Sequence, residues 1–453
     1  MTDLDALLPD GNYRSRTRTV VADVTGAEVA RLSSVPTLLV SRTIDTLRAA
    51  DPLDLDKRLA ALRHAGELFA GGSVDGMLAE DYFRLAARIG GLPIAVIREG
   101  AAVAVLRLAQ IGKSLDSARP HGAVTDWRDP RVHEGSAVWT RRGEVFSVHA
   151  SGTHPGAHSL WPEALAMGYR VAVRPTRREP LTAYRMVAAL RAAGFGPDQV
   201  VLLPTTQAAG DTMLTSADLA YGGDDIIRKY VDDPMVLQQQ PGRSKILITE
   251  DVDWRDYIDV IVSSVADHAG GGCVNTTGVL VEGDPAPVAE AVAERLAMLP
   301  SLPPEHPDAV LPVQQLVSAQ ALDRFLLSQA HGTRAWLGGE GILHDLGDGS
   351  AVLRPAVHQV DRSDARQLGV EMPFPCVWVG PWSRADGIAP LADTLVLTVA
   401  TEDERLVNQL ITAPGIGNVY LGQHPTYWTK PGLPHDGYLA DFLMRTKSVI
   451  RDR

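Results

Sequence analysis

The chain is poor in cysteine and has no long apolar run. Only two of its 453 residues are cysteines, Cys273 and Cys376, so a disulfide scaffold is excluded and a reducing compartment is expected. No run of about 18 apolar residues occurs, which argues against a helix that crosses a bilayer. The N-terminus lacks the basic and then apolar pattern of a signal peptide. These absences predict a cytoplasmic protein with no membrane partner.

Positive charge is outnumbered by negative charge. The chain has 43 Lys and Arg against 55 Asp and Glu, a formal net charge of −12. An acidic surface repels a phosphate backbone, so nucleic acid is not expected as a partner. Hydrophobic residues make up 45% and charged residues 22% of the chain, a globular composition that excludes a disordered protein. The length predicts two or three domains.

The alternation of apolar segments predicts an α/β fold. The first 115 residues are expected to be mostly helical, with an apolar stripe that includes Leu55, Leu59 and Leu62. Residues 119–143 are rich in turn formers and predict a loop or a small hairpin. Strands are expected at 145–150, 169–173, 200–203 and 219–221, and a second series of strands and helices begins near residue 245. Such repeated units indicate doubly wound parallel sheets, whose ligands bind at the carboxyl ends of the strands.

A cysteine follows three glycines in the segment Gly270-Gly271-Gly272-Cys273. Glycines let a backbone approach a ligand closely. A thiol at such a turn, reached from a cleft and near backbone amides, is expected to have a lowered pKa and to act as a nucleophile. The alternative is that Cys273 is a small buried hydrophobe. Cys376 has no such setting and is predicted to be structural.

Three histidines, His149, His154 and His158, lie within ten residues of one another. Zinc sites need three or four ligands held in a fixed constellation. A strand, a loop and a helix do not obviously bring these three side chains together. Polar contacts near a ligand cleft are therefore favoured, and no metal site is expected.

From residue 145 onward the chain resembles the aldehyde dehydrogenase superfamily. Five segments carry the resemblance in the family's order: 148–155 (VHASGTHP), 164–175 (ALAMGYRVAVRP), 217–223 (ADLAYGG), 270–273 (GGGC) and 371–375 (EMPFP). Cys273 stands where that family has its catalytic cysteine, so the resemblance favours the nucleophile over the buried hydrophobe.

The resemblance also implies a domain plan of two doubly wound α/β domains, one for the cofactor and one for catalysis, with a small oligomerisation element. The expected parts are a mostly helical N-terminal part of the cofactor domain (1–118), an oligomerisation hairpin (119–143), a nucleotide-binding core (144–235), a catalytic domain (236–413), and a return segment with an oligomerisation tail (414–453). Trp127, Trp139, Tyr427 and Trp428 are candidates for interface contacts. A homodimer or homotetramer is expected.

The chain departs from the family at two catalytic positions. Gln239 stands where oxidising members have a glutamate that acts as a base, and glutamine does not take a proton from water. Thr153 stands where the family has an oxyanion-binding asparagine, so that role is left to the Cys273 amide, to His154 or to Asn275. Segments 152–155, 177–180 and 221–225 are similar to bacterial acyl-CoA reductases, including the bioluminescence fatty-acid reductase.

The predicted function is therefore the reduction of an acyl thioester to an aldehyde through an acyl-enzyme on Cys273. The acyl group is expected to arrive on coenzyme A or on a carrier protein, with an acyl-activating or acyl-transferring enzyme as a possible partner. The alternatives are an aldehyde-oxidising dehydrogenase with another base, an acyl-phosphate reductase, and a catalytically silent member that scaffolds a biosynthetic complex.

A nicotinamide cofactor follows from the resemblance, and an arginine pair suggests which one. Arg174 stands where the family has a ribose-binding lysine, and Arg177 where many NAD-preferring members have glutamate. Arginine forks bind a 2′-phosphate, so NADPH is expected ahead of NADH, which remains possible. The alternative is that Arg177 and Arg178 merely solvate a loop. The expected cofactor residues are Ser151, Arg174, Thr176, Arg177, Gly222, Gly223 and Glu371.

Overall fold

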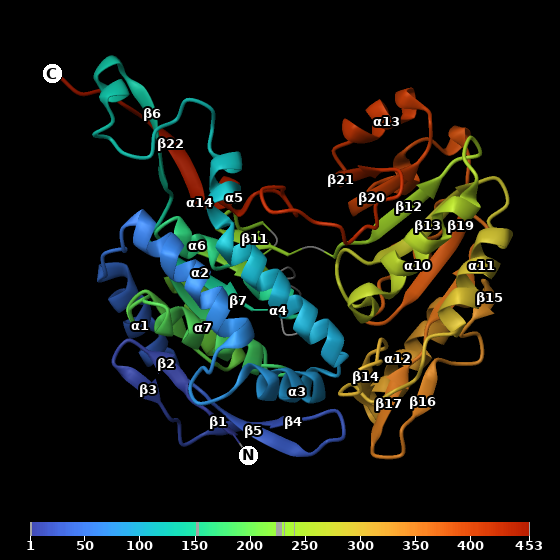
Figure 1. Cartoon of the computed structure of the whole chain (residues 1–453), viewed down its shortest axis with the longest axis horizontal. Helices are drawn as coiled ribbons and strands as arrows, with labels where there is room; N and C mark the ends of the chain where they lie inside the picture. Colours follow the sequence, from blue (N-terminus) through green and yellow to red (C-terminus); the bar gives the residue numbers. More distant parts are fainter. Residues whose placement is uncertain (1, 151–153, 223–228, 231, 240, 453) are drawn as a thin grey trace.

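Two seven-stranded sheets form the body of the molecule (Figure 1). The computed structural model describes residues 2–150, 154–222, 229–230, 232–239 and 241–452. The first sheet is parallel from β11 to β9 and ends in two antiparallel strands. Its order is β11 (Val236–Gln238), β10 (Leu219–Gly222), β7 (Val145–His149), β8 (Arg170–Arg174), β9 (Val200–Leu202), β2 (Ala6–Leu8) and β3 (Gly11–Tyr13).

Alternating side chains of the first sheet fill two separate cores. Phe146 and Val173 pack with one set of helices, whereas Val145 and Ala172 face the opposite side. This alternation follows from the two-residue period of a strand, and it lets one sheet bury both faces. The first face is covered by α2 (Leu55–Gly71), α3 (Ala79–Gly90), α4 (Ile94–Ala109), α6 (Glu163–Ala166) and α7 (Leu181–Ala192), and the second by α1 (Thr37–Ala49) and α8 (Gln207–Ser216).

The second sheet repeats this plan with one antiparallel edge strand, β15. Its order is β15 (Arg334–Leu337), β18 (Ala356–Gln359), β19 (Cys376–Trp382), β13 (Thr276–Glu282), β12 (Ser244–Ile248), β20 (Thr394–Ala400) and β21 (Ile416–Leu421). The helices α10 (Ile258–Ala266) and α11 (Ala286–Ala297) cover one face, and α12 (Leu316–Gln329) and α13 (Glu404–Ile411) the other. Cys376 is buried in this core, which confirms its structural role. The α/β prediction with two doubly wound sheets is confirmed.

The N-terminal part is not mostly helical from its start. Residues 2–33 form five short strands, and helices occupy only the stretch from α1 to α5 (Ile111–Ala118). Three of these strands, β1 (Thr2–Leu4), β4 (Arg18–Ala22) and β5 (Glu28–Ser33), make a separate small sheet. Strands of three to six residues carry too few apolar alternations to stand out in a sequence. A second small sheet joins β14 (Val313–Gln315), β17 (Ser350–Leu353) and β16 (Leu343–Asp345).

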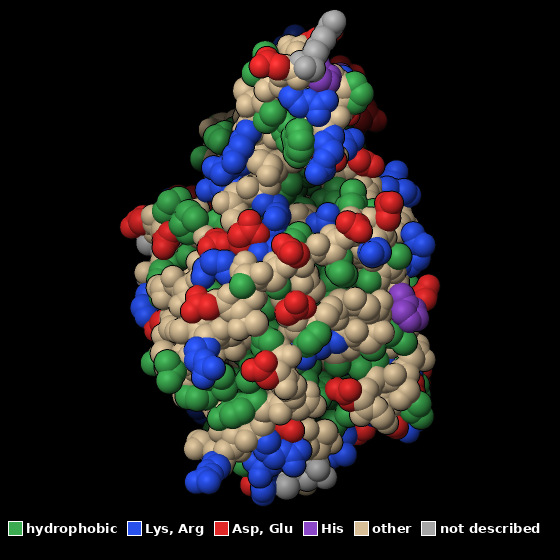
Figure 2. Space-filling view, turned by 90° about the vertical axis from the view of Figure 1, so that its left-hand side faces the viewer, with side chains coloured by type: hydrophobic (Ala, Val, Ile, Leu, Met, Phe, Trp, Pro, Cys, Tyr) green, Lys and Arg blue, Asp and Glu red, His purple; other side chains and the backbone are tan. Residues whose placement is uncertain are grey.

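The prediction of a hairpin within residues 119–143 was wrong. This stretch, all of it described, holds one strand, β6 (Ser136–Arg141), which pairs antiparallel with β22 (Met444–Val449) near the C-terminus. The two strands and their flanking turns form a protrusion that leaves the body of the molecule (Figure 1). Figure 2 shows it standing clear, with hydrophobic and basic side chains mixed on its surface.

The limits of the two domains also differ from those expected from the sequence. β11 belongs to the first sheet although it lies past the expected end at residue 235, and β21 belongs to the second sheet although it lies past residue 413. After β21 the chain returns to the first domain and enters α14 (Leu439–Leu443) and β22. In the described part of the chain, no helix is both long and apolar enough to cross a membrane.

A buried arginine fixes the helix layer over the first sheet. Arg185 on α7 donates hydrogen bonds to the carbonyls of Phe69 (2.8 Å), Gly72 (2.7 Å) and Met77 (2.9 Å). The last carbonyls of a helix have no partner within the helix, and an arginine fork satisfies several of them at once. Arg185 is 2% exposed, so its charge depends on these acceptors. These hydrogen bonds hold the end of α2 against α7, in the helix layer that also contains α4.

Candidate active site

Three distant segments meet around Cys273. The cysteine follows a short turn, η4 (Asp267–Gly270), and precedes β13. A Cβ at Gly242 would overlap the carbonyl oxygen of Cys273, so only glycine allows the 241–243 segment to lie there. The hydroxyl of Ser244 donates to that carbonyl at 3.0 Å. Gly270 has a φ of 71°, and a Cβ there would overlap Pro375, so this glycine serves backbone packing rather than ligand approach.

Asn275 holds the cysteine loop in place. Its Oδ1 accepts from the Gly272 amide at 2.8 Å, and its Nδ2 donates to the carbonyls of Ser264 (3.1 Å) and Asp267 (2.8 Å). Both amide protons are therefore used within the loop. The expectation that Asn275 donates to an oxyanion was wrong, because its side chain positions Cys273 instead.

The thiol of Cys273 is harder to ionise than the sequence suggests. Burial raises its pKa to about 11, and the carboxylate of Glu371 acts in the same direction. The amides of Cys273 and Val274 lower this pKa but do not outweigh burial. The expected lowering was wrong, since desolvation of the half-buried cysteine outweighs the effect of the two amides. A neutral thiol needs a base before it attacks a carbonyl.

One histidine contacts the thiol directly. The Nε2 of His435 lies 3.5 Å from the Sγ of Cys273. Burial lowers the pKa of His435 to about 4, and the nearby Arg107 lowers it further. The sequence analysis missed this residue, because 162 residues separate it from Cys273 and the segment around it was assigned to assembly. No local spacing in the sequence marks the pair.

Two cavities meet at Cys273. The inner cavity, of about 100 Å³, is closed by the return segment and lined by Tyr221, Glu163 and Asp436 among others. The outer cavity, of about 440 Å³, lies between α4 and the cysteine loop. Residues that line both cavities are Arg107, Leu160, Gln239, Cys273, Thr429 and His435.

The inner cavity holds ionisable groups in a dry setting. Burial raises the pKa of Glu163 to about 7, so this carboxyl group is partly protonated near neutral pH. Burial also raises the pKa of Asp436 and lowers that of Arg107. Arg107 donates to the Thr429 hydroxyl at 3.2 Å. Groups with shifted pKa values that converge beside a cysteine are typical of an active site.

The three predicted histidines do not share one site. His149 contacts Arg174 at 3.3 Å, whereas His154 lines the outer cavity with its ring centre 4.4 Å from that of His268. The Nδ1 of His154 accepts from the Gly156 amide, so its Nε2 carries the proton. Burial lowers the pKa of His154 to about 3, which keeps the ring neutral.

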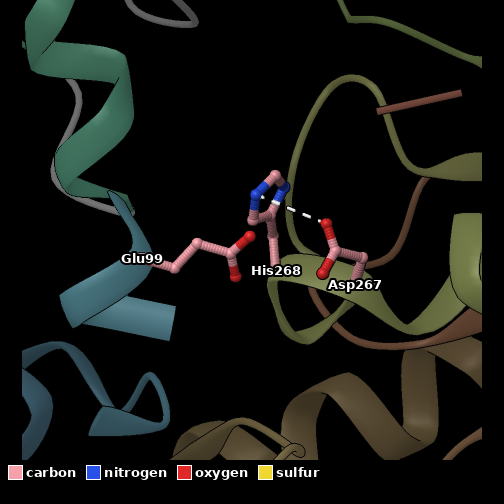
Figure 3. A group of neighbouring side chains, drawn as sticks. All are labelled: Glu99, Asp267 and His268. Carbon is pink, nitrogen blue, oxygen red and sulfur yellow. Dashed lines mark ion pairs between the residues drawn. The ribbon is translucent and has the colours of Figure 1, made fainter. Parts of the chain in front are cut away.

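A different group brings metal-ligating residue types together. The ligand atoms of Glu99, Asp267 and His268 lie within 4.8 Å of one another (Figure 3). Glu99 is exposed on α4, and His268 is paired with Asp267 at 3.4 Å. Glu99 and His268 line the outer cavity, so this group gives its rim an acidic character.

The carboxyl end of the first sheet carries the predicted cofactor residues. Arg174 ends β8, and its Nε donates to the Thr205 hydroxyl at 2.9 Å. A Cβ at Gly210 would lie 2.9 Å from that Nε, so glycine keeps room for the guanidinium. Arg177 is exposed on the loop after β8, and Thr176 accepts from the Arg178 amide there at 3.3 Å.

The other residues predicted to bind the cofactor lie on loops and at a strand end near the first sheet and the cysteine loop. Arg178 donates to Gln314 at 2.5 Å, so it does not merely solvate its loop. Gly222 ends β10 and accepts from the Gln239 amide, and Glu371 accepts from the Arg243 amide at 2.6 Å. Ser151, Thr153 and Gly223 lie outside the described residues. Arginine side chains at the carboxyl ends of parallel strands are suited to bind the ribose and phosphates of a dinucleotide.

Comparisons with known proteins bear on the family and the fold of the chain. A model of the aldehyde dehydrogenase family matches residues 156–446. Aldehyde dehydrogenase 1A1 of Rattus norvegicus is 24% identical over 263 residues, which cover 51% of this chain and 51% of that protein. The chain thus spans about half the length of this relative.

Solved structures match the fold over nearly the whole chain. An indole-3-acetaldehyde dehydrogenase of P. syringae in complex with NAD+ has a TM-score of 0.83 at 18% identity and covers 98% of this chain and 96% of its own. An NADP-dependent enzyme of E. coli has a TM-score of 0.81 at 16% identity and covers 99% of this chain and 98% of its own. With the family model matching more than half of its length, the chain belongs to the aldehyde dehydrogenase family.

Proposed function

We propose that the protein reduces an acyl thioester to an aldehyde through an acyl-enzyme on Cys273. The observation that carries this proposal is the place of Gln239, which lines both cavities together with Cys273. By resemblance, this is the position of the base that lets oxidising relatives hydrolyse their acyl-enzyme. An amide does not accept a proton from water near neutral pH, so an acyl group on Cys273 is protected from hydrolysis.

The chain's own residues account for the acyl-transfer half of the reaction. The Sγ of Cys273 attacks the thioester carbonyl, a C–S bond forms, and the bond to the leaving thiol breaks. The amide of Cys273 and the Nε2–H of His154 are the candidate oxyanion donors, since Asn275 uses its own donors on the carbonyls of Ser264 and Asp267. A reduced nicotinamide supplies a hydride when it is bound. The inner cavity keeps water from the acyl-enzyme because its wall is the folded return segment.

A second candidate function, the oxidation of an aldehyde, rests on Glu163. This carboxyl group lines the inner cavity with Cys273, and its pKa of about 7 is that of a usable general base. In that case Glu163 replaces the base that Gln239 lacks. An acyl-phosphate reductase would share the same cysteine chemistry with another leaving group. The contact between His435 and Cys273 supports a catalytic protein over a silent scaffold.

For the cofactor we propose a preference for NADPH. Arg177 is exposed beside Arg174 at the carboxyl end of β8, where a ribose 2′-substituent is read in sheets of this kind. A guanidinium favours a 2′-phosphate through charge-assisted hydrogen bonds.

We also propose a homodimer or homotetramer assembled through the protrusion. Trp127 is 49% exposed and Ile450 is 76% exposed on or beside its two strands. Exposed aromatic and aliphatic side chains together favour an interface. The leaving group is proposed to be coenzyme A or a carrier protein, delivered by an acyl-activating or acyl-transferring enzyme.

The first prediction concerns the reaction. Acetyl-, octanoyl- and benzoyl-coenzyme A are offered with NADPH, and aldehyde formation is followed by chromatography. At least one thioester is expected to give aldehyde, and Cys273→Ala is expected to lower that rate at least about 10³-fold while cofactor binding persists. Cys376→Ala is the control for loss of a thiol elsewhere. Turnover of aldehydes with NADP⁺ but of none of the thioesters, lost in Glu163→Gln, would favour oxidation instead.

The second prediction concerns the missing base. Gln239→Glu is expected to raise the hydrolysis of the acyl-enzyme about 10-fold or more, because a carboxylate then faces the thioester bond. Release of free acid after a single acylation measures this rate. Gln409→Glu, at an exposed glutamine on α13 that lines neither cavity, is the control. An unchanged hydrolysis rate would mean that position 239 does not face the acyl group.

The third prediction concerns cofactor choice. The wild-type protein is expected to have a higher kcat/KM with NADPH than with NADH, and Arg177→Glu is expected to shift this ratio about 10-fold or more toward NADH. Arg255→Glu, an exposed arginine of the other domain, is the control. Equal values for the two cofactors in the wild-type protein would contradict the proposal.

The fourth prediction concerns assembly. Light scattering at micromolar concentration is expected to give the mass of a dimer or a larger oligomer. Trp127→Glu together with Ile450→Glu is expected to lower that mass, because two charges would have to be buried. Phe325→Glu on α12, where the side chain is 46% exposed, is the control. A monomeric wild-type protein would refute the interface.

A further inference from the structure

We propose that His435 is the base that removes the thiol proton of Cys273 and returns it to the departing group. The proposal rests on the proposed function for the identity of that group, but the thiol–imidazole contact is independent of it. The Nε2 of His435 and the Sγ of Cys273 are 3.5 Å apart, within hydrogen-bond distance for sulfur. Both residues line both cavities, so a substrate that reaches the thiol also reaches the imidazole.

The surroundings keep the resting pair uncharged. The guanidinium of Arg107, on α4, lies close enough to His435 to oppose an imidazolium. The carboxylates of Glu371 and Asp436 oppose a thiolate on Cys273. Tyr221 on β10 also faces the cysteine, and burial raises its pKa so that it stays neutral. The thiol therefore donates to a neutral imidazole, and the proton moves as the sulfur attacks rather than beforehand.

The return segment is built to hold this imidazole. Pro431 and Pro434 restrict the backbone just before His435. The Nδ2 of Asn418, on β21, donates to the carbonyls of His435 (2.6 Å) and Leu395 (3.0 Å). The edge strand β21 and its neighbour β20 thus fix the backbone that carries the imidazole over the cysteine. Asn418 is a positioning residue, because it acts on Cys273 only through His435.

The proton and bonds balance over the acyl transfer. As the Sγ–C bond forms, the thiol proton passes to the Nε2 of His435. When the bond between the acyl carbon and the leaving sulfur breaks, the same proton passes from Nε2 to that sulfur. The products are the acyl-enzyme and a free thiol, the imidazole is neutral again, and no oxidant or reductant is needed.

The test compares single acylation events. Benzoyl-coenzyme A is mixed with excess protein without cofactor, and release of coenzyme A is followed by rapid quench and chromatography. His435→Gln is expected to slow the release about 100-fold or more, the usual contribution of a general base. His344→Gln, an exposed histidine on β16, is expected to leave it unchanged. Added imidazole is expected to restore part of the rate in His435→Ala, which a merely structural loss would not allow.

A second measurement does not depend on the substrate. Alkylation of Cys273 by iodoacetamide is expected to vary little between pH 6 and 9 in the wild-type protein, because proton transfer to the imidazole during the attack does not require a thiolate beforehand. The imidazole is neutral throughout this range and takes the proton only as the sulfur attacks. In His435→Gln the rate is expected to rise about tenfold per pH unit, as for an unassisted thiol. The same pH profile in both proteins would overturn the proposal, even if no thioester proves to be a substrate. The proposal would also be overturned if His435→Gln acylated at the wild-type rate but no longer hydrolysed its acyl-enzyme, since His435 would then activate water instead of the thiol.

Discussion

The burial of one thiol between two domains is the constraint on which the site depends. Cys273 sits where the 241–243 segment, the glycine turn and the 371–375 segment come together, and the contact of Gly242 with its carbonyl leaves no room for a side chain. The half-buried sulfur is partly shielded from water, and this desolvation raises its pKa to about 11. Shielding protects a thioester bond once it has formed, but it also removes the thiolate that would form it. The remaining chemistry of the site follows from that conflict.

Because the thiol is neutral, a base is needed to deprotonate Cys273 for acylation, and not only to activate the water that hydrolyses the acyl-enzyme. In the family, resemblance places a carboxylate at the position of Gln239, where it serves the second half of the reaction. Here that position is an amide, and the contact with the sulfur is made by His435 instead. Under the proposal made for His435, the base acts from the return segment and serves acylation, whereas the family's carboxylate serves deacylation. In the proposed reaction, the amide of Gln239 leaves the acyl-enzyme for reduction rather than for hydrolysis.

Much of the fold could be predicted from the sequence, for a physical reason. The parallel strands β7 and β13 are buried on both faces, so they appear as apolar runs between turn signals, and Cys273 stands out through its glycines. The strands β1 and β4 were missed because they are short and partly exposed. The pairing of β6 with β22 joins residues about 300 positions apart, and no local pattern carries such a contact. His435 was missed for the same reason, and the raised pKa of Cys273 was missed because burial is a property of packing and not of a motif.

The return segment links assembly to catalysis through a single run of chain. It leaves β21 in the catalytic domain, passes over Cys273 with His435, and continues through α14 into β22 of the protrusion. Asn418 holds it at one end, and the pairing of β22 with β6 holds it at the other. Tyr438 adds a hydrogen bond to the Gly432 carbonyl at 2.9 Å, which closes the loop that carries the imidazole. Part of the wall of the inner cavity, the proposed base and one strand of the proposed interface therefore belong to one continuous segment of chain.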